Sequence, residues 1–188
     1  SGIIGTGLGA DAPFFNVGKL AQSGVNSVRP NTIFAMILRS SADGGDRLFT
    51  IDLTTGKASP YIPAGKTDNK LQGTFVGGQG DIAFDPDNPN RLLVTSPGAA
   101  GTMAVYAIDI TTNAVTLIGT TNLTTNTGSL AFGEDGNLYA DNRTTGQLFR
   151  LPKLPVANYA NQVTPIGTIG EFSDFATLPI ATPKVDLI

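Results

Sequence analysis

Gly80-Asp81-Ile82-Ala83-Phe84-Asp85 is the stretch that decides the fold, because the chain repeats it. It returns as Gly128-Ser129-Leu130-Ala131-Phe132-Gly133 and more faintly as Ser173-Asp174-Phe175-Ala176. A second stretch, residues 47–56, returns in the same way at 104–113. Recurrence at about 45 to 55 residues is typical of modular repeat architectures. The repeats therefore predict an architecture, but they contain no catalytic motif.

Each repeat unit reads as four short β segments joined by turns. The segments predicted in the second and third units are 80–84, 90–95, 103–110 and 114–119, then 128–132, 137–140, 147–151 and 162–167. In the first unit the segments are 31–38, 47–53 and 58–62, preceded by a weaker one at 24–28. Four-stranded units rich in glycine and aromatic residues are typical of β-propeller blades. The prediction is an all-β, propeller-like array of about three four-stranded blades.

The predicted repeat domain covers residues 24–178, with units at about 24–63, 80–119 and 128–168. Residues 173–178 have the character of a first segment, and we expect them to close the array by lying beside 31–38. Residues 1–23, which are Gly-rich and then apolar, and the extended residues 179–188 are predicted to be arms. Closed propellers usually have about four to eight blades. The chain is therefore part of a longer propeller, or several copies complete one, or the units form an open stack or sandwich.

Composition excludes several classes of function. The chain has 188 residues, of which 40% are hydrophobic and 14% charged, and its net charge of −3 does not suit nucleic acid. It contains no Cys and no His, so disulfides, Ser-His or Cys-His nucleophile systems and Cys-based zinc sites are absent. No apolar run is as long as a membrane helix. No basic segment precedes an apolar core at the start, so we expect any signal peptide to have been removed.

The sequence pattern of the repeats resembles that of a broad group of bacterial exported and surface-associated propeller-like proteins, most of which have no assigned activity. The matching stretches are Ile82 to Val94, Leu130 to Ala140, Leu48 to Tyr61, Val105 to Gly119 and Leu148 to Gly167. This resemblance covers about 31–178 and implies a propeller-like fold outside the cell or at its surface. The same fold carries lactonases, lyases and binding modules, so it does not decide the activity.

Few motifs suggest chemistry. Gly5-Thr6-Gly7-Leu8-Gly9-Ala10 fits a dinucleotide-binding pattern but lacks the strand and helix that such a motif needs, so it is interpreted as part of the arm. Asp52 and Asp109 occupy equivalent places before Thr-Thr turns, which predicts that they cap those turns. The aromatic residues are predicted to form the core between blades; they include Phe34, Phe49, Phe84, Phe132 and Phe149.

The candidate metal ligands are carboxylates and amides, the hard oxygen ligands that calcium prefers. They are Asp85, Asp87 and Asn88 in the turn 85–90, and Asp81 and Asp174 at the starts of first segments. The spacing in 85–90 does not fit an EF-hand, and an Asx-rich turn is the favoured interpretation. Asn122 and Asn142 begin Asn-x-Thr triplets and are candidate glycosylation sites.

These observations favour a non-enzymatic, exported β-repeat module that binds a surface or assembles with itself, such as a cell-surface layer or filament subunit. We expect self-association through edge strands or the terminal arms, with a surface glycan or protein as a further partner, and no nucleic acid or membrane span. No catalytic residue and no cofactor is predicted, apart from calcium as an option. The alternative is a propeller-type metal-dependent hydrolase, lactonase or lyase that uses calcium held by Asp and Asn.

Overall fold

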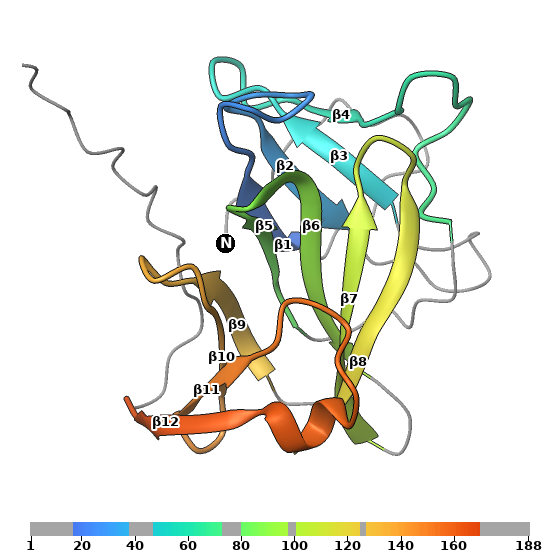
Figure 1. The fold of residues 1–188 in the computed structure, drawn as a ribbon. Coiled ribbons are helices and arrows are strands. Elements are labelled where there is room, and N and C mark those ends of the chain that lie inside the picture. The colour runs from blue at the N-terminus through green and yellow to red at the C-terminus, as the bar shows by residue number, and fades with distance from the viewer. Residues whose placement is uncertain (1–16, 38–46, 73–79, 98–100, 125–126, 170–188) are drawn as a thin grey trace, which may run out of the picture.

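The computed structural model describes residues 17–37, 47–72, 80–97, 101–124 and 127–169. The strands in these residues form three four-stranded antiparallel sheets, and each sheet is a meander of consecutive strands (Figure 1). Sheet A contains β1 (Val17–Gln22), β2 (Ile33–Ile37), β3 (Arg47–Ile51) and β4 (Ala58–Pro60). Sheet B contains β5 (Ile82–Asp85), β6 (Asn88–Pro97), β7 (Thr102–Asp109) and β8 (Ala114–Thr124). Sheet C contains β9 (Thr127–Phe132), β10 (Leu138–Asn142), β11 (Gln147–Leu151) and β12 (Thr164–Thr168).

The sheets have the order of blades in a propeller. The first strand of each sheet contacts the first strand of the next, β1 against β5 and β5 against β9. The remaining strands of each sheet follow outward in chain order. This confirms the predicted all-β, propeller-like array of three four-stranded units. A short 3-10 helix, η3 (Tyr159–Gln162), lies in the connection from β11 to β12 and contacts β8.

The first strand of sheet A is not where the sequence predicted it. Residues 24–28 form a turn, closed by the Ser23 amide donating to the Thr32 carbonyl at 3.0 Å. The strand is β1 instead, within residues 1–23, and it pairs with β2 along one side while β3 pairs along the other. The position beside 31–38 that was assigned to 173–178 is therefore occupied. Residues 173–178 and 179–188 lie outside the described residues.

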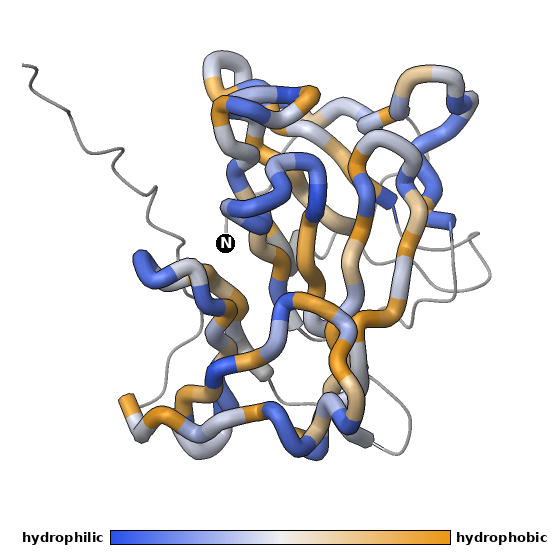
Figure 2. Tube along the Cα trace, viewed as in Figure 1, coloured by the Kyte–Doolittle hydropathy of each residue, from blue (hydrophilic) through white to orange (hydrophobic). Residues whose placement is uncertain are grey.

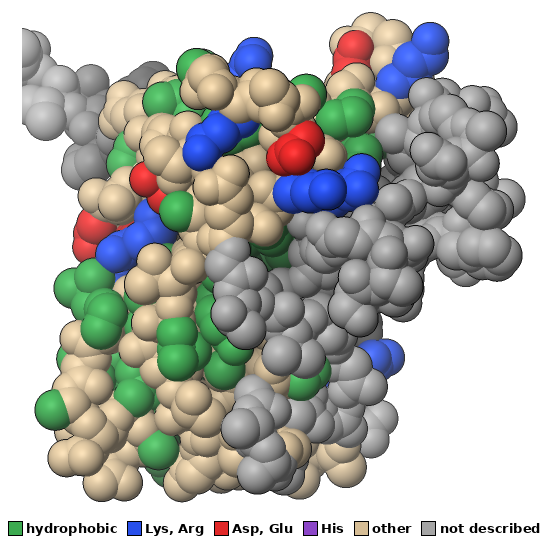
Figure 3. Space-filling view, turned by 90° about the vertical axis from the view of Figure 1, so that its right-hand side faces the viewer, with side chains coloured by type: hydrophobic (Ala, Val, Ile, Leu, Met, Phe, Trp, Pro, Cys, Tyr) green, Lys and Arg blue, Asp and Glu red, His purple; other side chains and the backbone are tan. Residues whose placement is uncertain are grey.

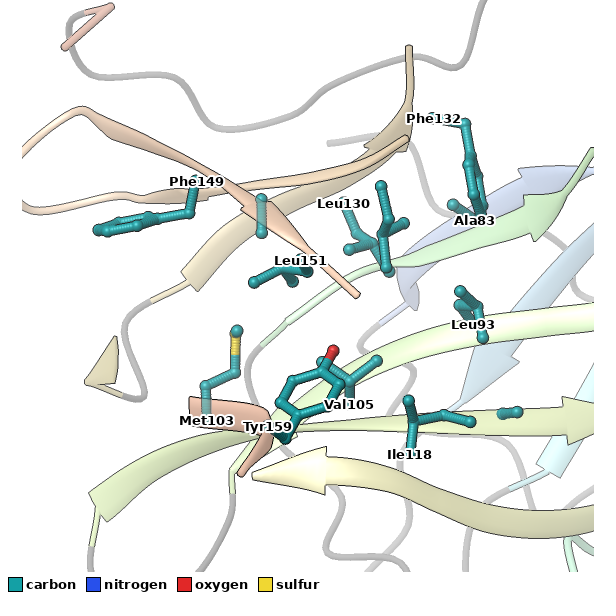
Figure 4. Close-up of a cluster of buried hydrophobic side chains, with 13 residues drawn as sticks. Ala83, Leu93, Met103, Val105, Ile118, Leu130, Phe132, Phe149, Leu151 and Tyr159 are labelled. Atoms are coloured by element: carbon teal, nitrogen blue, oxygen red, sulfur yellow. The ribbon is translucent and has the colours of Figure 1, made fainter. Parts of the chain in front are cut away.

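Two hydrophobic cores separate the three sheets, and sheet B contributes to both. Its strands alternate, so that Tyr106 and Ile108 face sheet A while Val105 and Ala107 face sheet C. Figure 4 shows the core between sheets B and C, where Leu93, Leu130 and Phe132 meet. Figure 2 shows that apolar residues are frequent along the middle strands of the array. Phe34, Phe84, Phe132 and Phe149 are confirmed as core between sheets, while Phe49 is buried on the outer face of sheet A.

One turn design recurs in all three sheets. Asp52 accepts hydrogen bonds from the Thr54 and Thr55 amides at 2.8 and 3.1 Å, and Asp109 accepts one from the Thr111 amide at 2.8 Å. This confirms the predicted turn caps. Four residues after each cap the backbone is left-handed, at Gly56 (φ 66°) and Asn113 (φ 58°). A glycine or asparagine suits that conformation at little cost.

Candidate functional site

The candidate calcium residues in the turn 85–90 are held by ion pairs with other parts of the protein. Asp85 is 1% exposed and accepts a hydrogen bond from the Arg91 Nε at 2.8 Å, with a second contact from the same guanidinium. Asp87 is exposed and forms an ion pair with Lys153, which follows strand β11 of sheet C. The Asp87 amide donates to the Asp85 carboxylate at 2.9 Å, as the Asx-turn interpretation requires. The Asp85–Arg91 ion pair therefore stabilises this turn within sheet B, and the Asp87–Lys153 ion pair connects the turn to the chain that follows β11.

Asp81 also joins two sheets. It is 5% exposed, and its Oδ2 accepts a hydrogen bond from the Leu130 amide at 3.0 Å. Its own amide donates to the Thr95 Oγ1 at 2.9 Å. Leu130 is on β9, the first strand of the next sheet. The carboxylate that the sequence offered as a candidate metal ligand satisfies a buried backbone donor between two blades.

The remaining predicted positions are separated in space or lie outside the described residues. Asn88 begins β6 and its Oδ1 accepts from the Asn90 amide at 3.3 Å, while Asp174 is outside the described residues. Within the described ranges no group of three or more acidic side chains lies close enough to hold a metal ion. Asn122 is exposed on β8, whereas Asn142 is half-buried and its Oδ1 accepts from the Thr144 and Thr145 amides. No helix in these ranges is long and apolar enough to cross a membrane.

Sheets B and C present the same register positions to the sheet that precedes each of them. In sheet B these positions form two rows, Ile82–Val94–Tyr106 and Phe84–Leu92–Ile108. In sheet C the equivalent rows are Leu130–Ala140–Phe149 and Phe132–Leu138–Leu151. The rows of sheet B belong to the core with sheet A, and those of sheet C to the core with sheet B. We call this side the back face of a sheet and the opposite side its front face.

The back face of sheet A has the same apolar character but no sheet against it among the described residues. Its rows are Leu20–Ala35–Phe49 and Gln22–Ile33–Ile51. None of these residues belongs to either core, and Leu20 is 48% exposed. Gln22 stands where sheets B and C have Phe84 and Phe132. Sheet A therefore carries the apolar rows of a blade interface, with one polar substitution, on a side that no described sheet covers, although Ala35 and Phe49 of these rows are only 2% and 7% exposed.

The front face of sheet C is the second outward side. Its middle row is Tyr139–Arg150–Thr164, and the next row contains Leu148 and Gly167. The corresponding positions of sheet B, Leu93 and Val105, are buried against sheet C. Arg150 is exposed, so this front face is more polar than that of sheet B.

A glycine on the front face of sheet B allows a side chain of the following unit to pack closely against that face. Gly119 of β8 lies against the ring of Tyr159 in η3, so closely that a Cβ there would be 2.1 Å from the ring. Tyr159 donates its hydroxyl to the Pro152 carbonyl at 2.6 Å, and burial raises its pKa well above the ordinary tyrosine value. Gly167 is the register equivalent in sheet C, and the space beyond it is open, with nothing within 4 Å of a Cβ built there.

A polar cleft of about 450 Å³ lies between the front face of sheet B and the loop that leads to η3. Arg91 and Asp109 are register partners on neighbouring strands, and both line it. Thr116 of β8 lines it next to them, and Pro155 closes the opposite side.

Figure 3 shows another side of the molecule, on which most of the charged side chains that are coloured lie in the upper half.

Comparison with solved structures shows that the chain is structurally similar to β-propeller proteins. It aligns with a chain of the nidogen/laminin complex at 13% identity and a TM-score of 0.48, covering 87% of this chain and 69% of that one. It aligns with TolB from Acinetobacter baumannii at 13% identity and a TM-score of 0.38, covering 84% of this chain and 45% of that one. No protein-family model matches the sequence, and no curated sequence is significantly similar to it. At these identities the similarity concerns the fold alone.

Proposed function

We propose that this protein is a non-enzymatic β-repeat module that associates with copies of itself, back face of sheet A against front face of sheet C. The observation that carries the proposal is the contrast between sheet B, which packs a sheet against each face, and the end sheets, each of which has one face that no other described sheet covers. The resemblance of the repeats to bacterial exported and surface-associated proteins supports a place at the cell surface, in a layer or filament.

The back face of sheet A and the front face of sheet C can pair because they would meet in the same front-to-back direction as the two existing interfaces. In both of those interfaces a front face receives the back face of the following sheet. Sheet C ends the described array with a front face, and sheet A begins it with a back face. A second copy placed so that its sheet A follows sheet C would continue the same order. Such a contact is heterologous, so it gives a ring if the rotation closes and a filament if it does not.

The apolar residues of the back face of sheet A that remain accessible for this contact are Leu20, Ile33 and Ile51. Burying one leucine-sized side chain stabilises an interface by roughly 1.5–3 kcal/mol. Leu20 is the most exposed apolar side chain of the face, at 48%, and lies beside Ala35 in the register. On the partner side, Leu148 and the open space at Gly167 provide the corresponding surface.

Light scattering across a concentration series tests the proposal. We expect the mass to rise above 19.4 kDa with concentration, to a discrete oligomer or to a growing polymer. Leu20→Lys places a charge in the contact and should weaken association by about ten- to a hundredfold. Leu53→Lys is the matched control, since Leu53 is 73% exposed in the turn between β3 and β4 and lies on neither face. A strictly monomeric protein at high concentration, or equal association of both variants, would contradict the proposal.

A further inference from the structure

The cleft between sheet B and the η3 loop is lined by polar side chains whose bonding capacity the fold does not use up. Asn90 accepts hydrogen bonds at its Oδ1 from the Val28 amide (2.8 Å) and from the Ser27 hydroxyl (3.3 Å), which leaves its amide NH₂ as a donor. Asn88 is bonded in the same way through its Oδ1 alone. Thr116 is exposed beside them on the cleft wall. Three neutral polar groups therefore line one opening.

The charges in the cleft are largely balanced within the protein. Arg91 forms an ion pair with the buried Asp85, and this pair fixes the direction of its guanidinium. Asp109 lies directly across the ladder from Arg91, and its Oδ1 is occupied by the amide and hydroxyl of Thr111. A charged ligand, whether an anion or a cation, would therefore contact both the positive Arg91 and the negative Asp109. A neutral ligand with several hydroxyl groups meets donors and an acceptor within one opening.

Apart from Thr111, the rest of the cleft is apolar. Ala107 and Ile118 form its floor, and Pro155 faces them from the loop before η3. Small-molecule sites usually combine such an apolar surface with a few placed polar groups, in volumes of about 300–1,000 Å³. A sugar ring has the matching chemistry, with C–H groups on its faces and hydroxyl groups around its edge.

We propose that this cleft, formed by Asn88, Asn90, Arg91, Asp109 and Thr116 over the Ala107–Ile118 floor, binds a neutral sugar residue of a glycan. The site lies between sheet B and the loop before η3 within one chain, and it uses neither the back face of sheet A nor the front face of sheet C. Its occupancy is therefore separate from self-association, and a failure of one proposal leaves the other standing.

Nuclear magnetic resonance with the intact chain tests the site. The probes are neutral monosaccharides and their dimers (glucose, galactose and N-acetylglucosamine), with inorganic phosphate and glycine as charged comparisons. We expect saturation transfer to at least one neutral sugar at millimolar concentration, and shifts of the backbone amides of Asn88, Asn90 and Thr116. Thr116→Val, which keeps the shape and removes the hydroxyl, should weaken that binding by about two- to tenfold.

Thr120→Val is the matched control, because Thr120 is exposed on the same strand but pairs with Ala104, whose side chain faces sheet A. This control should bind like the unchanged protein. Any of four results would overturn the proposal. They are no transfer to any of these sugars, amide shifts confined to other regions, equal binding by the two threonine variants, and tighter binding of phosphate or glycine than of every sugar.

Discussion

Strands β7 and β12 differ both in their place in the sheet and in what covers them: β7 lies between β6 and β8, whereas β12 is the outer edge strand of sheet C. In β7, six successive residues from Met103 to Ile108 are buried, because one sheet packs against each face. In β12, four of five residues are exposed, including Ile166 at 51%. The difference shows that a strand of this array is buried along most of its length where it has a paired strand on each side and a packed sheet on each face. Stability should therefore be concentrated in sheet B.

The largest expected difference between the two regions comes from removing a leucine-sized side chain. Leu93→Ala leaves a cavity in the core between sheets B and C, where Leu93 is 0% exposed, and should cost about 2–5 kcal/mol of unfolding free energy. Ile166→Ala on β12 should cost less than about 0.5 kcal/mol. Urea unfolding of both variants measures the contrast. Equal losses would mean that sheet C is covered as sheet B is.

Glycine substitutions compare the two front faces at one register position. Gly119→Ala forces its methyl group into the Tyr159 ring and should cost about 1–3 kcal/mol. Gly167→Ala meets nothing within 4 Å and should be neutral or stabilise by up to about 1 kcal/mol. Thermal unfolding of the pair gives the comparison. A large loss at Gly167 would show that this front face is already occupied, against the proposed mode of assembly.

Asp81 tests whether the joint between sheets B and C depends on the hydrogen bond that its carboxylate accepts from the Leu130 amide. Asp81→Ala leaves the Leu130 amide without its acceptor and should cost about 1–3 kcal/mol. Asp81→Asn keeps an acceptor oxygen and should cost less. Hydrogen exchange at the Leu130 amide should accelerate in the alanine variant first. Unchanged protection there would contradict this role.

The smallest expected effect is the contribution of Tyr159, whose ring packs against Gly119, to the pH dependence of the unfolding free energy. Burial raises the pKa of Tyr159 above its ordinary value of 10.0, so the folded state keeps the neutral form where the unfolded state ionises. Its contribution is complete below pH 10 and is lost as pH rises toward the folded-state pKa. Tyr159→Phe should cost about 1 kcal/mol at neutral pH, through the lost bond to Pro152, and should flatten the alkaline decline. Unfolding measured between neutral and alkaline pH would show an equally steep decline in both proteins if this is wrong.

The parts of the fold that the sequence predicted are those written in local patterns. The Asp52 and Asp109 caps were predictable because cap and turn lie within five residues, and the recurrence of short segments between turns marked the strands of sheets B and C. Strand β1 was missed because Gln22 replaces the phenylalanine that marks the first strand of the other units. Its recognisable feature is pairing with β2, which no short window of sequence shows.

The candidate site was less predictable, because it depends on contacts between residues far apart in the chain. The Asp81 carboxylate bonds to Leu130, and Asp87 pairs with Lys153, across the joint between two sheets. A sequence shows that such residues are acidic but not that a backbone amide or a lysine lies opposite. The cleft has the same origin, since Pro155 meets residues of β6, β7 and β8 only after the sheets have packed.

The back and front faces give the array a direction, and this has a consequence for how such a gene can change. Each sheet is completed by its own consecutive stretch of chain, and the back-face rows of sheets B and C are packed against the unit made before them. An in-frame duplication of one unit of about 45 to 55 residues would thus arrive with strand pairing and orientation already compatible with its neighbours. Growth after sheet C must accommodate Arg150 on its front face, and growth before sheet A must accommodate Gln22 on its back face. The number of blades is therefore a quantity that evolution can adjust one unit at a time, with one or two substitutions at the face that receives the new unit.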